Sequence, residues 1–315
     1  MTSSSCDISV IVPAYNSAAT LSRALESILG QEIDAHIEIL VCDDASTDNT
    51  TAIAAEIASR HPDKVRLIGS SVNRGLVTNY FEALAQCRGR YIADCAPDDY
   101  WLGTDTLARK YRLLEKNPEA VAVYTPWEEV NEQGQCTLRT GMGHNIPAGS
   151  PATRELIISL LQRQRPAPMH LSTMLYRTEV IRQALAVRPD RVRNTDYGIE
   201  DLPIMLALAS AGTILYLPTP SLGYTVGQPS ISNPADAGRC ALFSAQCSLT
   251  CRELALYYGI PLREIRDSMR HHLAYALSQA RHSHNREIKR NVVQAVRRCH
   301  TPLSLKGYIL KAICV

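Results

Sequence analysis

The stretch that decides the fold is Ile8-Ser-Val-Ile-Val-Pro-Ala-Tyr-Asn16. Its first residues, Ile8 to Val12, are rich in β-branched side chains, which favour a buried β-strand, and Pro13 ends the run. The apolar residues from Leu21 to Leu29 then recur with the spacing of one helix face. A second short apolar run follows from Ile37 to Cys42. A strand, a helix and another strand in this order predict a βαβ unit with parallel strands.

The same alternation continues along the chain. Further strands are predicted at Val65 to Ile68, Tyr91 to Cys95, Val121 to Tyr124, Leu171 to Tyr176, Ile214 to Leu217 and Leu222 to Val226, with a turn at Asn131 to Gly134. Further helices are predicted at Leu76 to Cys87, Asp105 to Glu115, Arg154 to Leu161 and Ile199 to Ala211. Ser46 is expected to cap a helix that carries Ile53 and Ile57, and every pattern after Pro234 is helical. We therefore predict an α/β fold with a Rossmann-like, doubly wound, mostly parallel sheet and a C-terminal helical extension.

The composition narrows the class of protein. The 315 residues are 45% hydrophobic, which is enough apolar material for a large core. A formal net charge of +2 gives no reason to expect a nucleic-acid partner. The ten cysteines show no CxxC spacing, no secretory signal is visible, and no stretch is long and apolar enough to span a bilayer. These features predict a protein of the reducing cytoplasm.

Polar residues follow each of the first four predicted strands. They are Pro13-Ala-Tyr-Asn16, Asp43-Asp-Ala-Ser46, Asn73-Arg-Gly75 and Asp98-Asp-Tyr-Trp101. In an open parallel sheet, ligands bind beyond the carboxyl ends of the strands, so these four groups should meet in one crevice. Each alone has a simpler reading, because an Asp-Asp-x-Ser run after a strand is often only a helix cap. The coincidence of four such strand ends indicates a ligand site.

These motifs, in this order and spacing, resemble family 2 glycosyltransferases with the A-type fold. The resemblance rests on Ile8 to Asn16, Glu38-Ile-Leu-Val-Cys-Asp-Asp-Ala-Ser-Thr-Asp48, Asn73 to Gly75, Gly89-Arg-Tyr-Ile92, Asp98 to Trp101, Glu200-Asp201, Tyr224 and Ser230-Ile-Ser-Asn233. It implies a catalytic domain over residues 1–234, with a nucleotide-sugar half at about 1–125 and an acceptor half at about 126–234. Residues 235–315 would form a separate basic helical region.

The resemblance also implies how the donor binds. The base of a nucleotide-sugar, with UDP favoured, would lie across Tyr15, and Asp44 would accept a hydrogen bond from its edge. A carboxylate suits the imide N–H of uracil. The other residues expected to bind the nucleotide-sugar are Pro13, Ala14, Asn16, Asn73, Arg74, Gly75 and Asp98.

Asp98 and Asp99 match the family's metal motif, in which one carboxylate faces the donor and the other binds a divalent cation. Hard oxygen ligands predict Mg²⁺ or Mn²⁺, with Asp99 as the main protein ligand and Asp98 beside it. The cation would offset charge on the departing diphosphate. The chain departs from the family pattern at Ala96 and Pro97, where many members carry acidic residues, and Asp94 is expected inside the strand. The alternative is that Asp99 caps the following turn.

An inverting transferase needs a general base for the acceptor hydroxyl. The resemblance assigns this role to Asp201, with Glu200 as the alternative, while the competing interpretation is an acidic first turn that interacts with the helix dipole. The acceptor side is expected to include Trp101, His170, Ser172 and Thr173. Many relatives carry a histidine where this chain has Gly227.

The resemblance thus implies an inverting, metal-dependent transferase that moves a sugar to a glycan or lipid-linked acceptor, in polysaccharide biosynthesis. One alternative is a sugar-nucleotidyltransferase, although Pro13 to Asn16 is not the glycine-rich loop with a basic residue that this class needs. The other alternative is a catalytically inactive nucleotide-sugar-binding protein, suggested by Ala96 and Pro97.

The C-terminal region carries most of the positive charge. From Ala235 to Val315 there are 13 lysines and arginines against five acidic residues, a formal charge of +8. After Pro302 the chain is short, apolar and interrupted by two lysines. This pattern suggests peripheral association with an anionic membrane, at the inner face of the cell membrane. The alternative is that these helices pack on the catalytic domain with their basic face in water.

Overall fold

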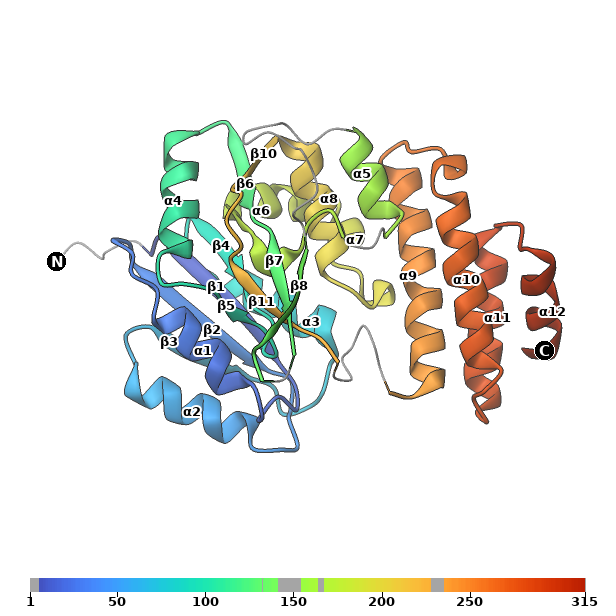
Figure 1. Cartoon of the computed structure of the whole chain (residues 1–315), viewed down its shortest axis with the longest axis horizontal. Coiled ribbons are helices and arrows are strands. Elements are labelled where there is room, and N and C mark those ends of the chain that lie inside the picture. Colours follow the sequence, from blue (N-terminus) through green and yellow to red (C-terminus); the bar gives the residue numbers. More distant parts are fainter. Residues whose placement is uncertain (1–5, 132, 141–153, 164–166, 228–234, 315) are drawn as a thin grey trace.

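A seven-stranded sheet forms the centre of the protein, whose computed structural model describes residues 6–131, 133–140, 154–163, 167–227 and 235–314 (Figure 1). The strand order is β10-β6-β9-β4-β1-β2-β3. The strands are β1 (Ile8–Ala14), β2 (Ile37–Asp43), β3 (Val65–Gly69), β4 (Tyr91–Asp94), β6 (Ala120–Tyr124), β9 (Leu175–Arg177) and β10 (Thr213–Tyr216). Of these seven, β9 alone runs antiparallel to both neighbours. The predicted α/β fold with a mostly parallel sheet is confirmed.

The sheet is buried on both faces because successive residues of its central strands point to opposite sides. Val10 and Val12 belong to one apolar cluster, whereas Ile11 belongs to the other. The first cluster is covered by α1 (Leu21–Leu29), α2 (Thr50–Arg60) and α4 (Thr106–Lys116). The second is covered by α3 (Leu76–Gln86), α5 (Arg154–Leu161), α6 (Thr178–Val187), the short α7 (Pro189–Val192) and α8 (Asp201–Ala211).

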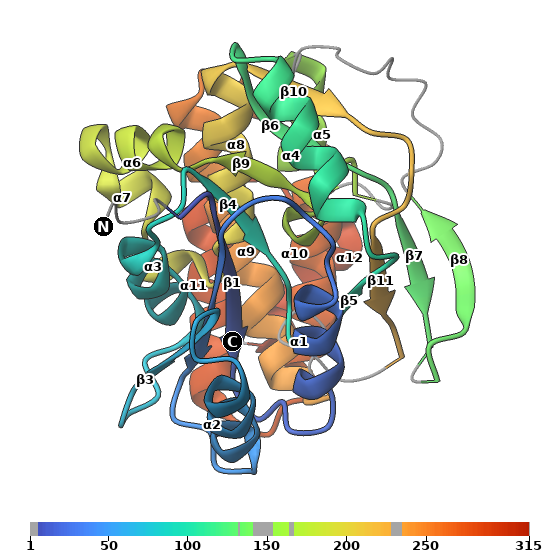
Figure 2. The ribbon, with the colours of Figure 1, turned by 90° about the vertical axis from the view of Figure 1, so that its left-hand side faces the viewer.

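A second, four-stranded sheet lies beside the first, as Figure 2 shows. Its order is β5-β11-β7-β8, built from β5 (Tyr100–Trp101), β11 (Leu222–Thr225), β7 (Trp127–Val130) and β8 (Cys136–Thr140). The predicted turn between β7 and β8 is confirmed, since the Gly134 N–H donates to the Asn131 carbonyl at 2.9 Å. Gly223 allows β11 to approach β5, because a Cβ there would lie 2.6 Å from the Tyr100 ring. This sheet brings β11 against the Asp98-Asp99 segment.

The C-terminal region is helical, as predicted, and its helices stand side by side beyond α8 (Figure 1). They are α9 (Ala237–Tyr257), α10 (Arg266–Ala280), α11 (Arg286–Cys299) and α12 (Leu305–Cys314). Leu254 of α9 and Leu273 of α10 belong to the same buried cluster as Ile11 of β1. The helical extension therefore shares a core with the central sheet.

Two local predictions were wrong. Ser46 does not cap α2, which begins four residues later, because its hydroxyl donates to Asp43 and accepts from the Asn16 N–H. The predicted strand over Leu171 to Tyr176 begins as a 3-10 turn, η1 (Leu171–Thr173), and only then becomes β9. The Thr173 hydroxyl donates to the His170 carbonyl at 2.7 Å, and such local side-chain bonds compete with extended structure. Two further 3-10 turns are η2 (Thr195–Tyr197) and η3 (Leu262–Glu264).

Candidate active site

The carboxyl ends of the first strands lie level at one edge of the sheet. Ala14 pairs with Asp43 across β1 and β2, and Asp43 pairs with Gly69 across β2 and β3. On the other side of β1, Ile11 pairs with Asp94, the last residue of β4. The loops that follow these four strands therefore open on the same edge, as the strand-end motifs predict.

Asn16 joins the first two loops and leaves Tyr15 exposed. The side-chain oxygen Oδ1 of Asn16 accepts from the Thr47 N–H at 2.8 Å, and the backbone N–H of Asn16 donates to the Ser46 hydroxyl at 2.9 Å. Asn16 has a φ of 50°, a left-handed conformation that asparagine tolerates better than most residues. The ring of Tyr15 is 44% exposed, which leaves it available to a ligand.

Asp44 connects the second loop to the third. Its side chain is buried, and its two carboxylate oxygens accept from the backbone N–H groups of Arg74 at 2.8 Å and Gly75 at 2.7 Å. Gly75 has a φ of +84°, which explains a glycine at this position. The Asp44 N–H donates to the Ala14 carbonyl at 3.0 Å, so Asp44 connects three strand ends. Each oxygen retains a lone pair for a ligand.

The guanidinium of Arg74 does not turn toward this edge. It pairs with Glu82 of α3 at 2.5 Å, while Asn73 is exposed in the same loop. Pro13 and Ala14 are the last residues of β1, and Ala14 is buried. The structure thus brings the predicted nucleotide-sugar residues to one edge, although several of them act there through backbone groups.

Asp99 is fully buried and only half satisfied. One carboxylate oxygen accepts from the Thr225 N–H of β11 at 2.9 Å, and the other has no hydrogen-bond partner. The Asp98 carbonyl accepts from Arg23 of α1 at 2.9 Å and from the Thr225 hydroxyl at 2.5 Å. The guanidinium of Arg23 also lies 4.6 Å from the centre of the Tyr100 ring. The Asp98-Asp99 segment is therefore held both by α1, through Arg23, and by β11, through Thr225.

Sequence reasoning missed Arg23 and Thr225 as part of this site. The helical period of α1 marks Leu21, Leu25 and Ile28 as core positions, and an arginine between them has the pattern of an ordinary solvated face. The contacts to β11 span more than a hundred residues and carry no local signal. Ser230 to Asn233, which continue the resemblance, lie outside the described residues.

The charge on the two carboxyls is poorly compensated. Burial raises the pKa of Asp98, and burial together with the Asp98 charge raises the pKa of Asp99 well above its ordinary value. The positive charge of Arg23 lowers both pKa values, but it offsets the effect of burial only in part. A divalent cation would relieve both effects, and the unpartnered oxygen of Asp99 gives it a ligand. Among the described residues no group of three histidine, cysteine or acidic side chains could hold a metal, so a ligand would have to supply further oxygens.

Asp94 lies inside β4, as predicted, and is not part of that pair. Its carboxylate accepts from the Tyr80 hydroxyl at 2.6 Å, and Tyr80 lies 2.9 Å from the hydroxyl of Tyr176. Burial raises the pKa of Asp94 to about 7 despite these bonds. The negative charge of Asp94 also contributes to raising the pKa of Glu200.

Glu200 and Asp201 stand at the start of α8. One carboxylate oxygen of Asp201 accepts from the Leu202 N–H at 2.6 Å, within the first turn. Burial raises the pKa of Glu200, and the charges of Asp201 and Asp94 raise it further. A proton on Glu200 is therefore favoured near neutral pH.

The charge of Asp201 also acts on His170. Burial lowers its pKa, and the charge of Asp201 acts in the opposite direction. Its Nδ1 accepts from the Ser172 N–H at 3.3 Å, so the neutral ring carries its proton on Nε2. The ring packs between Trp127, at 5.9 Å between centroids, and Tyr224, at 5.0 Å. Trp127 was not predicted at the site; its only signal was an aromatic residue in a strand.

The other residues expected on the acceptor side have buried side chains. Trp101 is 3% exposed, within the core beside α1, and Ser172 and Thr173 are also buried. Thr173 is held through its carbonyl, which accepts from Lys110 of α4 at 2.9 Å. In this structure these residues support the segment that carries His170, and direct contact with an acceptor stays a prediction.

The chain belongs to glycosyl transferase family 2. The model of this family matches residues 9–184, more than half of the chain. The matched residues include Asp44, Asp98, Asp99 and His170, whereas the Glu200-Asp201 pair and β11 follow the matched stretch.

Curated relatives match over part of their length. A protein of Mycobacterium tuberculosis is 32% identical over 127 residues, which is 40% of this chain and 37% of that protein. Chondroitin synthase of Escherichia coli is 35% identical over 140 residues, covering 44% of this chain and 19% of the synthase. The succinoglycan biosynthesis protein ExoO of Rhizobium meliloti is 44% identical over 117 residues, covering 37% and 31%. The chain thus spans less than two fifths of each of these relatives.

Solved structures share the fold across almost the whole chain. S. aureus TarS in complex with UDP-GlcNAc superposes with a TM-score of 0.58 at 15% identity, covering 97% of this chain and 90% of that one. The mannosyltransferase PcManGT of Pyrobaculum calidifontis, in complex with GDP-Man and Mn²⁺, gives 0.53 at 20% identity, covering 97% and 78%. At these identities the comparison establishes the A-type glycosyltransferase fold.

Proposed function

We propose that this protein is an inverting glycosyltransferase that moves a sugar from a nucleotide-sugar, with UDP favoured, to a glycan or lipid-linked acceptor in polysaccharide synthesis. The observation that carries the proposal is the buried Asp98-Asp99 segment at the sheet edge, which β11 links to His170: the Thr225 N–H donates to Asp99, and the ring of Tyr224 packs on His170. Asp98 and Asp99 lie on the donor side, next to the loops held by Asp44. Asp201 is near enough for its charge to act on His170, and Glu200 precedes Asp201 in the chain. The relatives in chondroitin and succinoglycan synthesis support the product class.

The donor base would stack on Tyr15, which is exposed, and meet Asp44 at its edge. Asp44 already accepts two backbone N–H groups, which fix its carboxylate, and its free lone pairs suit an N–H donor such as that of uracil. The UDP-GlcNAc bound by TarS supports UDP, and the GDP-Man bound by PcManGT keeps a guanine nucleotide as the second candidate.

Mn²⁺ or Mg²⁺ would be held by Asp99, with Asp98 beside it. The unpartnered oxygen and the raised pKa of Asp99 suit this role, and PcManGT contains Mn²⁺. Such a cation supplies positive charge that offsets the negative charge developing on the diphosphate. Arg23 adds a fixed positive charge at the same place.

We assign the general base to Asp201 and keep Glu200 as the alternative. The pKa of Glu200 is raised, so this residue tends to hold its proton and is the poorer base near neutral pH. In the proposed step the acceptor hydroxyl gives its proton to the Asp201 carboxylate. The acceptor oxygen forms a bond to the sugar carbon from the far side as the bond to the diphosphate breaks. The nucleoside diphosphate leaves with that electron pair.

Two observations keep an inactive nucleotide-sugar-binding protein as the second candidate. Ala96 and Pro97 stand where many relatives carry acidic residues, and Asp99 is fully buried. A sugar-nucleotidyltransferase has less support, because the loop after β1 is not glycine-rich and the family match is to transferases.

The compartment is part of the proposal. All ten cysteines are free, which is consistent with a reducing cytoplasm. None of the helices in the described part of the chain has the length and apolar character needed to cross a membrane. A lipid-linked acceptor would then have to be reached from the membrane surface.

The experiment that tests the proposal is a screen of UDP-, GDP- and TDP-sugars by thermal shift, each with Mn²⁺, Mg²⁺ or EDTA. A ligand that binds the native state raises its melting temperature, by an amount that grows with its concentration over Kd. The donor that binds best is then tested for hydrolysis and transfer. Binding without hydrolysis or transfer would favour the inactive protein.

Asp99→Asn tests the metal. This variant should abolish transfer and weaken donor binding with Mn²⁺ present, because one oxygen ligand and its charge are lost. It should have little effect on donor binding in EDTA. Wild-type turnover in the variant, or turnover of the wild type that EDTA does not change, would contradict the metal role.

A further inference from the structure

The last helix exposes an apolar face. In α12, Leu310 and Cys314 are buried against the neighbouring helices, and the Cys314 thiol donates to the Leu277 carbonyl of α10 at 3.6 Å. Away from these buried residues, Tyr308, Ile309 and Ile313 are 53%, 55% and 56% exposed. Ile309 and Ile313, four residues apart, share one side of the helix, and Tyr308 flanks it. A helix that is apolar on both sides should have a second partner beyond its own fold.

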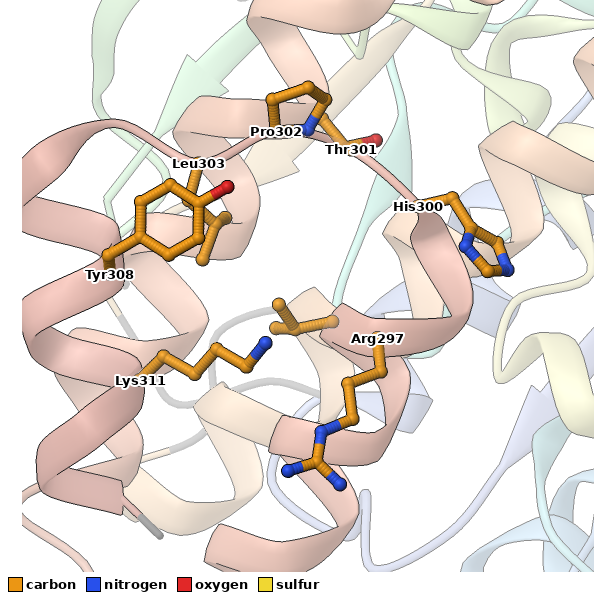
Figure 3. Close-up of a pocket in the computed structure, with 8 residues that line it drawn as sticks. Arg297, His300, Thr301, Pro302, Leu303, Tyr308 and Lys311 are labelled. Atoms are coloured by element: carbon orange, nitrogen blue, oxygen red, sulfur yellow. The ribbon is translucent and has the colours of Figure 1, made fainter.

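A positively charged groove borders this face. Between α11 and α12 lies an open cavity of about 350 Å³, shown in Figure 3. Arg297 lines it from α11, and Lys311 and the exposed Tyr308 line it from α12. Among the described residues no carboxylate pairs with Arg297 or Lys311, whereas the adjacent Arg298 lies 3.7 Å from Glu253. Both cations are therefore available to an anion.

The location of these features fits an external surface. α12 is the outermost element of the helical extension, at the end of the molecule farthest from β3 (Figure 1). The whole region from residue 235 onward carries a formal charge of +8. An apolar helix face beside unpaired cations is the combination that binds the interface of an anionic bilayer.

We propose that α12 docks on an anionic phospholipid surface. Ile309 and Ile313 enter the boundary between headgroups and acyl chains, and the groove between Arg297 and Lys311 receives a lipid phosphate. The two parts act together, since the apolar side chains supply area removed from water and the cations attract the negative leaflet. This inference goes beyond the proposed transfer reaction and does not depend on it, because it concerns residues outside the sheet edge.

The test is co-sedimentation of the full chain with phosphatidylcholine vesicles that contain or lack phosphatidylglycerol. We expect binding to the anionic vesicles only, weakened by salt. Arg297→Gln with Lys311→Gln should reduce this binding roughly 30-fold, since each basic residue near such a surface contributes about a factor of five. Ile309→Ser with Ile313→Ser should also abolish most of the binding. Truncation is less informative, because removing α12 would expose the core that Leu310 covers.

Matched controls distinguish binding through this face from non-specific effects of positive charge and of exposed apolar side chains. Arg60→Gln with Lys64→Gln removes the same charge from exposed positions at the other end of the molecule. Val187→Ser with Leu256→Ser removes two apolar side chains that are 72% and 52% exposed elsewhere. Both control variants should bind anionic vesicles like the wild type, and all variants should keep the wild-type melting temperature.

The proposal is overturned if the full chain stays in the supernatant or binds neutral vesicles equally well. It is also overturned if the control pairs lose as much binding as the α11 and α12 pairs. Competition by inorganic phosphate at constant ionic strength would indicate a site for a soluble anion instead of a lipid. A change of oligomeric state in the isoleucine variant, without loss of vesicle binding, would assign the face to a second copy of the chain.

Discussion

Asp44 and its neighbour Asp43 have different structural roles at the end of β2. The Asp44 carboxylate accepts the N–H groups of Arg74 and Gly75, so it fixes the third loop against the end of β2. Asp43, one residue earlier, instead accepts from the hydroxyls of Ser46 and Thr51. Two adjacent aspartates thus have different tasks: one stabilises its own loop, and the other connects neighbouring loops and keeps lone pairs for a ligand.

Nucleotide recognition can be tested without metal or sugar. Tyr15→Ala should weaken binding of free UDP by about 5- to 150-fold, because stacking of a base on an aromatic ring contributes roughly 1–3 kcal/mol. Tyr15→Phe keeps the ring and should bind like the wild type. Asp44→Ala should also weaken binding, through the lost acceptor and a loosened loop. Isothermal titration calorimetry measures all three, and unchanged affinity in both alanine variants would mean that these strand ends do not hold the base.

The choice of base is a second test at the residue scale. Asp201→Asn should cut turnover by roughly a hundredfold or more and leave donor affinity nearly intact, as expected when only general-base catalysis is lost. The asparagine carbonyl can still accept the Leu202 N–H, so the helix start should be preserved. Glu200→Gln is the matched control and should have the smaller effect. If Glu200→Gln loses turnover and Asp201→Asn does not, the role moves by one residue.

At the scale of elements, Lys110 connects α4 to the segment that carries His170. Its ammonium is fully buried, donates to the Thr173 carbonyl at 2.9 Å and lies 5.7 Å from the centre of the Trp101 ring. Burial lowers the pKa of Lys110 to about 7. Helix α4, which follows the Asp98-Asp99 motif, therefore holds the segment that carries His170 through the side chain of Lys110. Burial disfavours the charged form of this side chain.

This contact predicts an unusual pH dependence of stability. Between about pH 7 and the ordinary lysine value, the unfolded chain binds a proton that the folded chain does not, so Lys110 makes the protein more stable as pH rises. The contribution is present at high pH and is lost as pH falls toward 7. One proton corresponds to at most about 1.4 kcal/mol per pH unit.

Lys110→Met removes the titrating amine, so the stability of the protein should depend less on pH. Near pH 6 the variant should be as stable as the wild type or more stable, because no buried charge remains. Near pH 9.5 it should be less stable by about 1 kcal/mol, the typical net value of the lost hydrogen bond. Urea unfolding at both pH values measures the difference, with Lys64→Met, at an exposed lysine, as control. A constant offset between Lys110→Met and wild type across pH would contradict the assignment.

The elements themselves could be predicted because period and burial agree. The β-branched runs of β1 and β2 and the helical spacing of α1 are strong local signals, and the structure places each of these elements within a residue or two of the prediction. The failures occurred where side chains bond to nearby backbone. Ser46 serves Asp43 and Asn16 instead of a helix end, and Thr173 folds back on His170 to form η1.

The candidate site also contains some residues that could be predicted from the sequence and others that could not. The sequence could predict that Asp44, Asp98 and Asp99 follow strands which end at one edge, because the strands that precede them are parallel. Arg23, Thr225 and Trp127 could not be predicted, because their contacts depend on how a helix and the second sheet pack against that edge. The burial of Trp101 was also hidden, since an aromatic residue after an acidic motif has the same pattern whether it faces a ligand or the core.

At the scale of the whole molecule, the predicted boundary between residues 234 and 235 does not separate two hydrophobic cores. Leu254 of α9 is fully buried in the cluster that also contains Leu40 of β2. We therefore expect one cooperative unfolding transition, since two units with a shared core lose their contacts together. Both tryptophans, Trp101 and Trp127, belong to the second sheet, so their fluorescence reports on the catalytic part.

Leu254→Ala should lower stability by about 2–5 kcal/mol through the cavity it leaves. If the core is shared, the tryptophan fluorescence transition and the far-UV circular dichroism transition should move together in urea, although the substitution lies outside the sheet. Leu256→Ala, on the same helix but at a side chain that is 52% exposed, should leave both transitions in place. Loss of helical signal ahead of the fluorescence change would mean that the C-terminal helices unfold as a separate unit. The region from residue 235 onward would then be an independent attachment to the transferase.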